Sequence, residues 1–170
     1  MKKTALLLIC FALILLAGQN ANAQLNPSPY YKYAAGLKFS GYENGVSGKY
    51  FINENNALEA MVGLRSHGLV VTGLYELHQT AFNVAELKFY YGAGGHIGGV
   101  GSGIYKKYSS DDKYYNNGSI LIGADAVVGL EYLIPESPIA LSLDLNPRLE
   151  IGRGPFFDLA PGLGIKYAFK

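Results

Sequence analysis

The chain of 170 residues contains no tryptophan, one cysteine and two methionines, and only 16% of its residues are charged. The single cysteine, Cys10, lies in an apolar run near the N-terminus that we expect to be removed, so the mature chain would have no thiol. Such a chain forms no disulfide, no cysteine-ligated metal centre and no cysteine nucleophile. Its stability must therefore come from packing, hydrogen bonds and charge pairing.

Clusters of basic residues are also missing. The 14 lysines and arginines stand against 13 acidic residues, and without Lys2 and Lys3 the formal charge is near −1. Proteins that bind nucleic acid usually carry lysine and arginine in runs or patches, because they must neutralise phosphates. We therefore expect no nucleic-acid partner.

The N-terminus has the three-part layout of a secretory signal peptide. Two lysines precede a short apolar run, and the polar stretch that follows ends in a small-x-small cleavage site at residues 21–23. The run is shorter than the roughly 20 residues that a membrane-spanning helix needs, so a retained anchor is the weaker alternative. We assign residues 1–23 to a cleaved signal peptide for Sec export and residues 24–170 to one mature domain.

Long apolar runs are absent from the mature chain, which excludes a transmembrane helix. Instead the dominant period is two, and turn-forming clusters separate eight segments that we predict to be strands. These predicted strands are 33–40, 45–52, 57–66, 69–79, 86–97, 119–133, 139–151 and 158–170. The 22 glycines and 14 tyrosines, together with apolar residues at alternate positions, are typical of a membrane barrel.

The clearest alternation lies in the predicted strand 119–133. One face carries only apolar side chains: Ile120, Ile122, Ala124, Ala126, Val128, Leu130 and Tyr132. The opposite face carries Gly123, Asp125, Gly129 and Glu131. Strands this long exceed the usual 5 to 6 residues of soluble sheets and match the 9 to 11 residues that cross a bilayer at a tilt. We therefore predict that the apolar face meets lipid and the charged face lines a narrow lumen.

Closure of the sheet follows from the same premise. An open edge in hydrocarbon would leave backbone groups unpaired, so the first and last strands must pair. We predict an all-β fold, a closed antiparallel eight-stranded transmembrane β-barrel. An even strand number places both termini on the periplasmic side. The long connection 98–118 is then extracellular, and 53–56 and 134–138 are tight periplasmic turns.

Aromatic side chains are expected to form girdles at the two membrane interfaces. The periplasmic set is Tyr30, Tyr31, Tyr33, Phe82, Tyr132, Tyr167 and Phe169. The outer set is Phe39, Tyr42, Tyr105, Phe156 and Phe157.

Four stretches, at residues 21–23, 89–96, 143–149 and 164–169, carry a resemblance that covers essentially the whole mature chain. The chain is similar to the small eight-stranded outer-membrane barrels of the OmpA/OmpX-like superfamily, in the style seen in Bacteroidetes. The resemblance implies a monomer in the outer membrane of a Gram-negative cell envelope, in contact with lipid and lipopolysaccharide. It also implies that the barrel-assembly machinery reads the terminal strand, although Phe169 is followed here by Lys170 instead of closing the chain.

Acidic and basic residues are balanced on the predicted lumen face. The acids are Glu59, Glu76, Asp125, Glu131, Asp144 and Glu150, and the bases are Lys38, Lys49, Arg65, Lys88, Arg148 and Lys166. Because buried charge is costly unless it is paired, the matched numbers predict a cross-linked polar network that fills the barrel. Eight strands leave little room beyond side chains, which argues against a general pore, with a narrow gated path as the alternative.

Histidine raises the alternative of a barrel enzyme that modifies lipid A. His67, His78 and His96 are too dispersed for a metal site, and no histidine follows His96 where deacylase barrels place theirs. A pairing of His96 with Ser102 or Ser66 is not required by any spacing. The glycine-rich stretch 92–103 lacks the GxGxxG order and the following helix of a phosphate loop. We therefore predict no catalytic, cofactor or metal site.

Three functional interpretations remain. The leading one is a structural or surface-interaction barrel, in which the connection 98–118, with its mixture of aromatic and charged residues, contacts an extracellular partner. The second is a lipid A-modifying enzyme. The third is a small-molecule-binding barrel, soluble and lipocalin-like, in which the apolar face would enclose the ligand and the charges would face water.

Overall fold

The computed structural model describes residues 31–41, 43–65, 67–105, 107–108, 111–115, 118–152 and 155–169. The assigned signal peptide, the mature start and Tyr30 lie outside the described residues, as do Tyr42, Ser66 and the side chain of Tyr105. Within the described part of the chain, no helix is long and apolar enough to cross a membrane.

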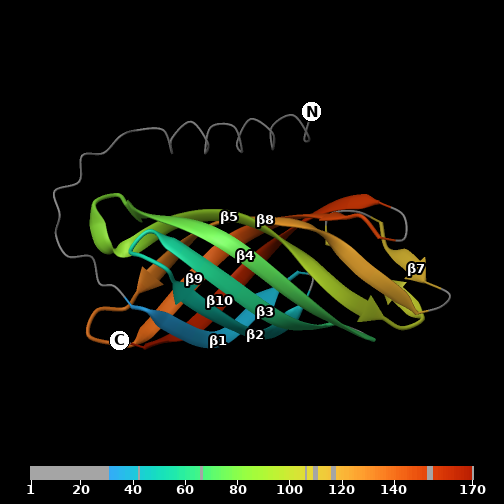
Figure 1. Ribbon diagram of the computed structural model, residues 1–170, viewed down its shortest axis with the longest axis horizontal. Coiled ribbons are helices and arrows are strands. Elements are labelled where there is room, and N and C mark those ends of the chain that lie inside the picture. Colours follow the sequence, from blue (N-terminus) through green and yellow to red (C-terminus); the bar gives the residue numbers. More distant parts are fainter. Residues whose placement is uncertain are drawn as a thin grey trace.

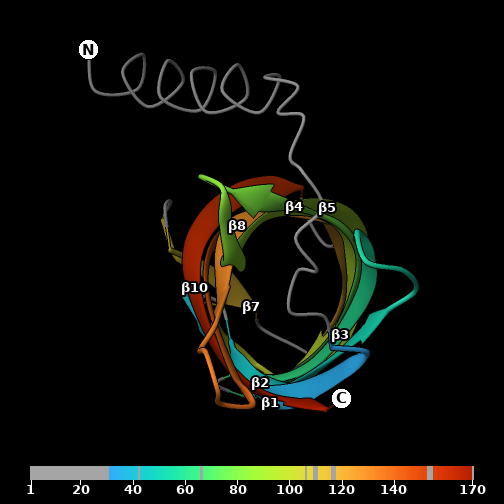
Figure 2. The same ribbon diagram turned by 90° about the vertical axis from the view of Figure 1, so that its left-hand side faces the viewer.

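Eight long strands close into an antiparallel barrel with the order β1-β10-β9-β8-β5-β4-β3-β2 (Figures 1 and 2). Their bounds are β1 Tyr33–Ser40, β2 Asn44–Phe51, β3 Asn56–Arg65, β4 Gly68–Ala81, β5 Val84–Val100, β8 Ser119–Leu133, β9 Ile139–Glu150 and β10 Phe156–Phe169. Two short strands, β6 Gly103–Tyr105 and β7 Lys113–Tyr115, form a separate hairpin at one end of the barrel. We call this end the hairpin end.

The predicted all-β, closed antiparallel eight-stranded barrel and all eight predicted strands are confirmed, with differences of a few residues at the strand bounds. The largest difference is in β5, which extends to Val100 because Gly98 and Gly99 stay paired with β4 and β8. The β6–β7 hairpin was not predicted, because its strands have only three residues each and show no usable alternation.

Closure is made by β1 and β10. Their register runs from Tyr33 opposite Phe169 to Ser40 opposite Gly162, so the full length of β1 is paired on this side. On its other side β1 pairs with β2 from Tyr33 to Phe39. β1 is therefore hydrogen-bonded to a neighbour on each side, and the sheet has no free edge among the eight barrel strands.

The two faces of the sheet are inverted relative to a water-soluble barrel. Large apolar side chains such as Ile120, Ile122 and Leu143 point outward and are half or more exposed, whereas Glu59, Glu76 and Asp144 point inward and are buried. Two aromatics of the predicted girdles are exceptions. Tyr31 is buried in the lumen and Phe156 packs against an interior apolar cluster, so the assignment of Tyr31 to the periplasmic girdle and of Phe156 to the outer girdle is wrong.

Tyr31 and Phe156 deviate for a simple reason. Tyr31 precedes β1 and turns into the barrel end, where its ring contacts that of Phe51 edge-on at 5.0 Å between centroids. Phe156 is the first residue of β10 and occupies an inward position of the alternation. The orientation of these two side chains at strand ends is thus set by the space available at the barrel mouth and not by the position of a membrane interface.

Glycine has opposite roles on the two faces. At Gly129, which faces the lumen on β8, an added Cβ would lie 2.6 Å from the Leu143 carbonyl oxygen and 2.6 Å from the Asp144 Cβ. At Gly73, which faces outward on β4, an added Cβ would meet nothing within 4 Å. The lumen glycines are therefore fixed by crowding, whereas Gly73 is not.

We predict that Gly129→Ala lowers the free energy of unfolding by about 1–3 kcal/mol, because the new methyl group overpacks the β8–β9 contact. The matched control Gly73→Ala should leave stability unchanged or slightly raised. Urea titration of the refolded protein, monitored by far-ultraviolet circular dichroism, measures the free energy of unfolding of both variants. Equal losses for the two variants would contradict the crowding argument.

Candidate functional site

Buried charge in the lumen is the feature most open to a functional role. Of the charged residues predicted to face inward, all but Lys88 have buried side chains, and Lys88 is half-buried near the end opposite the hairpin. The structure adds Glu43, Asp158, His78 and His96 to the buried set. These groups divide into two clusters, one in the middle of the barrel and one toward the hairpin end.

Lys49 is the hub of the middle cluster. Its Nζ lies 2.8 Å from a Glu131 carboxylate oxygen, 2.9 Å from one of Glu76 and 3.3 Å from one of Glu59. The ammonium group also sits 4.6 Å from the centroid of the Tyr90 ring, within the range of a cation–π contact. One fully buried cation thus compensates three carboxylates that reach it from β3, β4 and β8.

Two further lysines complete the middle cluster. Lys166 Nζ lies 3.2 Å from Glu59 Oε1, and Lys38 Nζ lies 3.2 Å from Asp144 Oδ2. The Tyr90 hydroxyl donates a hydrogen bond of 2.5 Å to the same Asp144 oxygen. The cluster therefore links strands on opposite sides of the ring, so that the barrel is cross-braced through its centre.

Aromatic rings close the middle cluster at the end opposite the hairpin. His78 is fully buried, stacks on Tyr90 with 5.0 Å between ring centroids, and approaches Glu76 Oε2 to 3.0 Å through Nε2. The Tyr31 hydroxyl donates to Glu131 Oε1 at 2.7 Å. Burial, together with the negative charge of Glu131, raises the pKa of Tyr31 well above its ordinary value, so this hydroxyl remains a donor.

Arg148 organises the cluster near the hairpin end. It donates through Nε to Asp125 Oδ1 at 2.5 Å and through both terminal nitrogens to Glu43, at 3.0 and 3.2 Å. Arg65 Nε also donates to Glu43, at 2.8 Å. Burial alone would raise the pKa of Glu43, but the two guanidinium groups outweigh burial and hold that pKa below its usual value. Glu43 is thus an anion at neutral pH.

His96 lies beside Arg148 and bridges two carboxylates. Its Nδ1 is 2.7 Å from Asp125 Oδ2, and its Nε2 is 3.0 Å from Glu150 Oε2. Both ring nitrogens therefore face acids, and neither faces a serine hydroxyl. Ser102, one of the two serines considered as a partner, is exposed, and the other lies outside the described residues. The structure thus does not bring His96 and Ser102 together as a pair.

Register neighbours are not always ion-pair partners in this lumen. Lys88 and Glu131 are directly opposite on β5 and β8, yet the cation that contacts Glu131 within ion-pair distance is Lys49. Lys88 is only half-buried because it lies near the barrel mouth. Arg148 and Glu150 share the layer at the other end, where Asp125 and His96 connect them.

Two of the buried acids were missed in the sequence. Glu43 lies in the β1–β2 connection, where no alternation indicates a direction, and only its attraction to Arg65 and Arg148 turns it inward. Asp158 follows Phe156 in the inward row of β10 and accepts a hydrogen bond from the Tyr108 backbone N–H at 2.8 Å. Asp158 alternates with the outward Phe157 and Leu159, so its position could have indicated the lumen.

Part of the long connection folds back over the hairpin end. Besides the Tyr108 contact with Asp158, the Lys107 ammonium lies 4.8 Å from the centroid of the Phe156 ring. The connection leaves from β5 and returns to β8, yet both contacts are made with β10, two strands farther around the ring. This segment therefore spans the rim between β8 and β10.

Two small cavities lie among the described residues inside the barrel. One of about 20 Å³ lies between the two charged clusters, next to Lys38, Glu59 and Arg148, and another of about 20 Å³ lies near Glu131 and Lys88. Each is about the size of one water molecule. Within the described residues, no group of three or more histidine, cysteine, aspartate or glutamate side chains is arranged to hold a metal ion.

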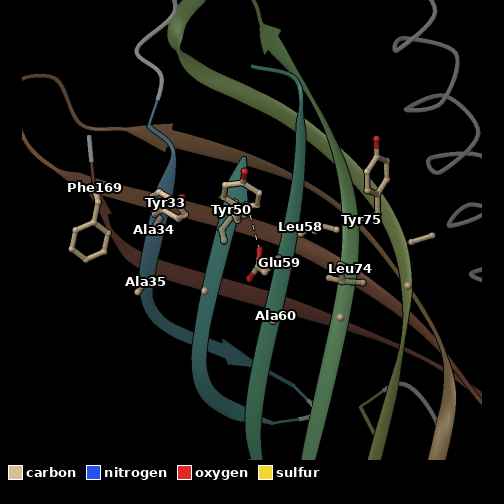
Figure 3. Close-up of a pocket in the computed structure, with 15 residues that line it drawn as sticks. Tyr33, Ala34, Ala35, Tyr50, Leu58, Glu59, Ala60, Leu74, Tyr75 and Phe169 are labelled. Atoms are coloured by element: carbon tan, nitrogen blue, oxygen red, sulfur yellow. Dashed lines mark ion pairs between the residues drawn. The ribbon is translucent and has the colours of Figure 1, made fainter. Parts of the chain in front are cut away.

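A larger depression of about 750 Å³ lies on the outside of the barrel (Figure 3). Its floor is a row of small residues that are successive register partners on β1 to β4: Ala35, Gly48, Ala60 and Gly73. Larger side chains border the row on one side: Tyr33, Tyr50, Leu58 and Tyr75. The depression is apolar and shallow, and it offers no converging polar groups to a substrate.

No protein-family model matches this chain, and no curated protein matches it in sequence. Among solved structures, the chain is similar to the N-terminal β-barrel domain of OprF from Pseudomonas aeruginosa. The two are 18% identical, with a TM-score of 0.54, and the alignment covers 79% of this chain and 95% of that domain. The likeness shows a shared fold, that of a small closed eight-stranded β-barrel.

Proposed function

We propose that this protein is an integral outer-membrane β-barrel with a structural or surface-interaction role, whose lumen is filled by a charge network and is not a general pore. The observation that carries the proposal is the inversion of the two faces. Large apolar side chains cover the outside while lysine, arginine, aspartate and glutamate are buried inside. In water this arrangement would expose the apolar wall, whereas in a bilayer the wall is solvated by lipid.

The lumen supports the second part of the proposal. Both charged clusters extend across the ring, and the cavities near them have about 20 Å³ each. A hydrated ion needs a continuous wider path, so the packing of Lys49 and Arg148 against their carboxylates favours a plug. The same network ties strands together that are not neighbours in the ring, which suits a structural role.

The proposed location in the outer membrane implies three kinds of partner. The outer wall would contact lipid and lipopolysaccharide, and the terminal strand β10, which ends in Phe169, would be read by the barrel-assembly machinery. The β6–β7 hairpin presents exposed Ile104 and Tyr114 and would supply the surface for an extracellular partner of a monomeric barrel.

The two alternatives are less well supported. A lipocalin-like barrel requires apolar residues inside and charges outside, which is the reverse of the observed arrangement. A lipid A-modifying enzyme requires a nucleophile or base free to react. The described His96 has both ring nitrogens against carboxylates, and His78 is fully buried between rings.

Location is tested by expressing the full chain in a Gram-negative host and separating the membranes. We expect the protein in the outer-membrane fraction, in a form that migrates faster in gels before boiling than after, because a closed barrel stays compact in detergent. A soluble periplasmic protein without this shift would refute the proposed location.

We predict that Leu143→Arg and Ala126→Arg each destabilise the barrel folded into lipid vesicles by about 2–4 kcal/mol, because both positions face outward in mid-strand. The control Gln79→Arg lies on the same face near the end of β4 and should cost at most about 1 kcal/mol. Spin labels at positions 126 and 143 that report water instead of lipid would contradict the face assignment.

The charge plug makes a separate prediction. Lys49→Met should destabilise the barrel by about 3–5 kcal/mol, because it removes the buried cation that three buried carboxylates share. Lys88→Met, half-buried at the mouth, is the matched control and should cost less than about 1 kcal/mol. Equal losses of stability in the two variants would contradict the central role of Lys49 in the network.

In planar bilayers the wild-type protein should show no large steady conductance, because the lumen is blocked by paired side chains. Large reproducible channels in the wild type would overturn the plug and support a transport role. The Lys88→Met variant should remain closed, since it leaves the contacts of Lys49 intact.

A further inference from the structure

The contacts of His96 determine how many protons its ring must carry. An imidazole with one proton donates through one nitrogen and presents a lone pair at the other. In this structure both nitrogens lie within hydrogen-bond distance of a carboxylate oxygen, at 2.7 Å for Asp125 and 3.0 Å for Glu150. A neutral ring would direct a lone pair at one of these oxygens.

Both carboxylates are engaged as acceptors at their other oxygens, so neither supplies the missing proton. Asp125 Oδ1 accepts from Arg148 Nε at 2.5 Å. Glu150 Oε1 accepts from the backbone N–H groups of Ile122, at 2.9 Å, and Gly152, at 3.1 Å. A carboxylate surrounded by donors is held in its ionised form. The remaining oxygens therefore also act as acceptors toward the ring.

We propose that His96 is a protonated staple that fastens β5, β8 and β9 together near the hairpin end, and that loss of its proton loosens this end of the barrel. His96 lies on β5, Asp125 on β8 and Glu150 on β9. The staple is the set of these three side chains. It is a pH-sensitive device built into the fold, and it does not depend on the location of the barrel.

Among the described residues around the staple, one further cation contacts it. Arg148 on β9 faces Asp125, and its other nitrogens are bound to Glu43 of the β1–β2 connection. On β4 the register partner of His96 is Thr72, whose hydroxyl accepts from Arg148. On β8 its partner Gly123 leaves room for the ring, since a Cβ there would lie 2.6 Å from the His96 Cε1. Arg148 cannot replace the imidazolium, because it is already engaged by Glu43 and Asp125.

The staple connects to the segments around the mouth. Through Glu150 it holds the Gly152 backbone at the start of the β9–β10 connection. Through Asp125 and Arg148 it reaches Glu43 and then Arg65, so that one chain of charged contacts runs across the lumen from β5 to β3. Removing a proton from the His96 ring leaves Glu150 facing a nitrogen lone pair, which weakens the His96 end of this series of charged contacts.

The direction of the pH effect follows from the donor role of the ring. The staple stabilises the folded barrel while His96 is protonated, so its contribution is complete below about pH 6.5, the ordinary value for an unfolded histidine. It is lost as the pH rises and the folded ring loses its proton. The linkage is to one proton, so the folding equilibrium constant changes by at most about tenfold per pH unit.

The direct test is nitrogen NMR of the full chain with labelled histidine, folded in detergent micelles. We expect both His96 ring nitrogens to carry protons at about pH 7.5, a pH at which most unfolded histidines have lost one. The urea-unfolded chain is the reference. A folded His96 that is a neutral tautomer at this pH would overturn the proposal, whatever the variants show.

A variant pair provides the second measurement. The folding equilibrium constant of the wild type should fall between about pH 6.5 and pH 9 by at least about tenfold more than that of His96→Gln, whose amide does not titrate. The control His67→Gln replaces a histidine on the exposed β3–β4 turn and should keep the wild-type profile. Parallel profiles for the wild type and His96→Gln would refute the staple. If His96→Gln does not fold, the NMR measurement decides alone.

Discussion

The pairing of β1 with β10 is the constraint on which the other features depend. It converts a sheet into a ring, which leaves no unpaired edge and fixes an inside and an outside. Eight strands make a narrow ring, so the side chains that point inward compete for little space. Glycine at positions such as 129, where an added Cβ would collide with β9, is a consequence of that narrowness.

Because the lumen is narrow and its charged side chains are buried, charge inside it must be compensated locally. Lys49 with three carboxylates, and Arg148 with Glu43 and Asp125, show how this is achieved with few side chains. A buried ion pair contributes little net stability relative to an apolar pair, but removing one member is costly. The network therefore defines one arrangement of the strands and makes departures from it expensive.

The fold could be predicted from the sequence because alternation over long strands is a local signal. The apolar row from Ile120 to Tyr132 indicates both a strand and its outward face without any knowledge of its neighbours. Specific partners could not be predicted, because they depend on register. Lys88 is opposite Glu131 on the adjacent strand, yet Lys49, from across the ring, makes the contact. Glu43 and Tyr31 lie outside the strands, where alternation gives no direction.

Strand length varies around the ring, and this affects how the lumen meets its surroundings. β1 and β2 have eight residues each, while β5 and β8, which lie diametrically opposite in the ring order, have 17 and 15. The barrel wall is thus taller along β5 and β8, the high wall, than along β1 and β2, and its openings are inclined to the barrel axis. A molecule that approaches along the high wall is screened from the lumen, whereas over β1 and β2 it meets the buried charges after a much shorter path.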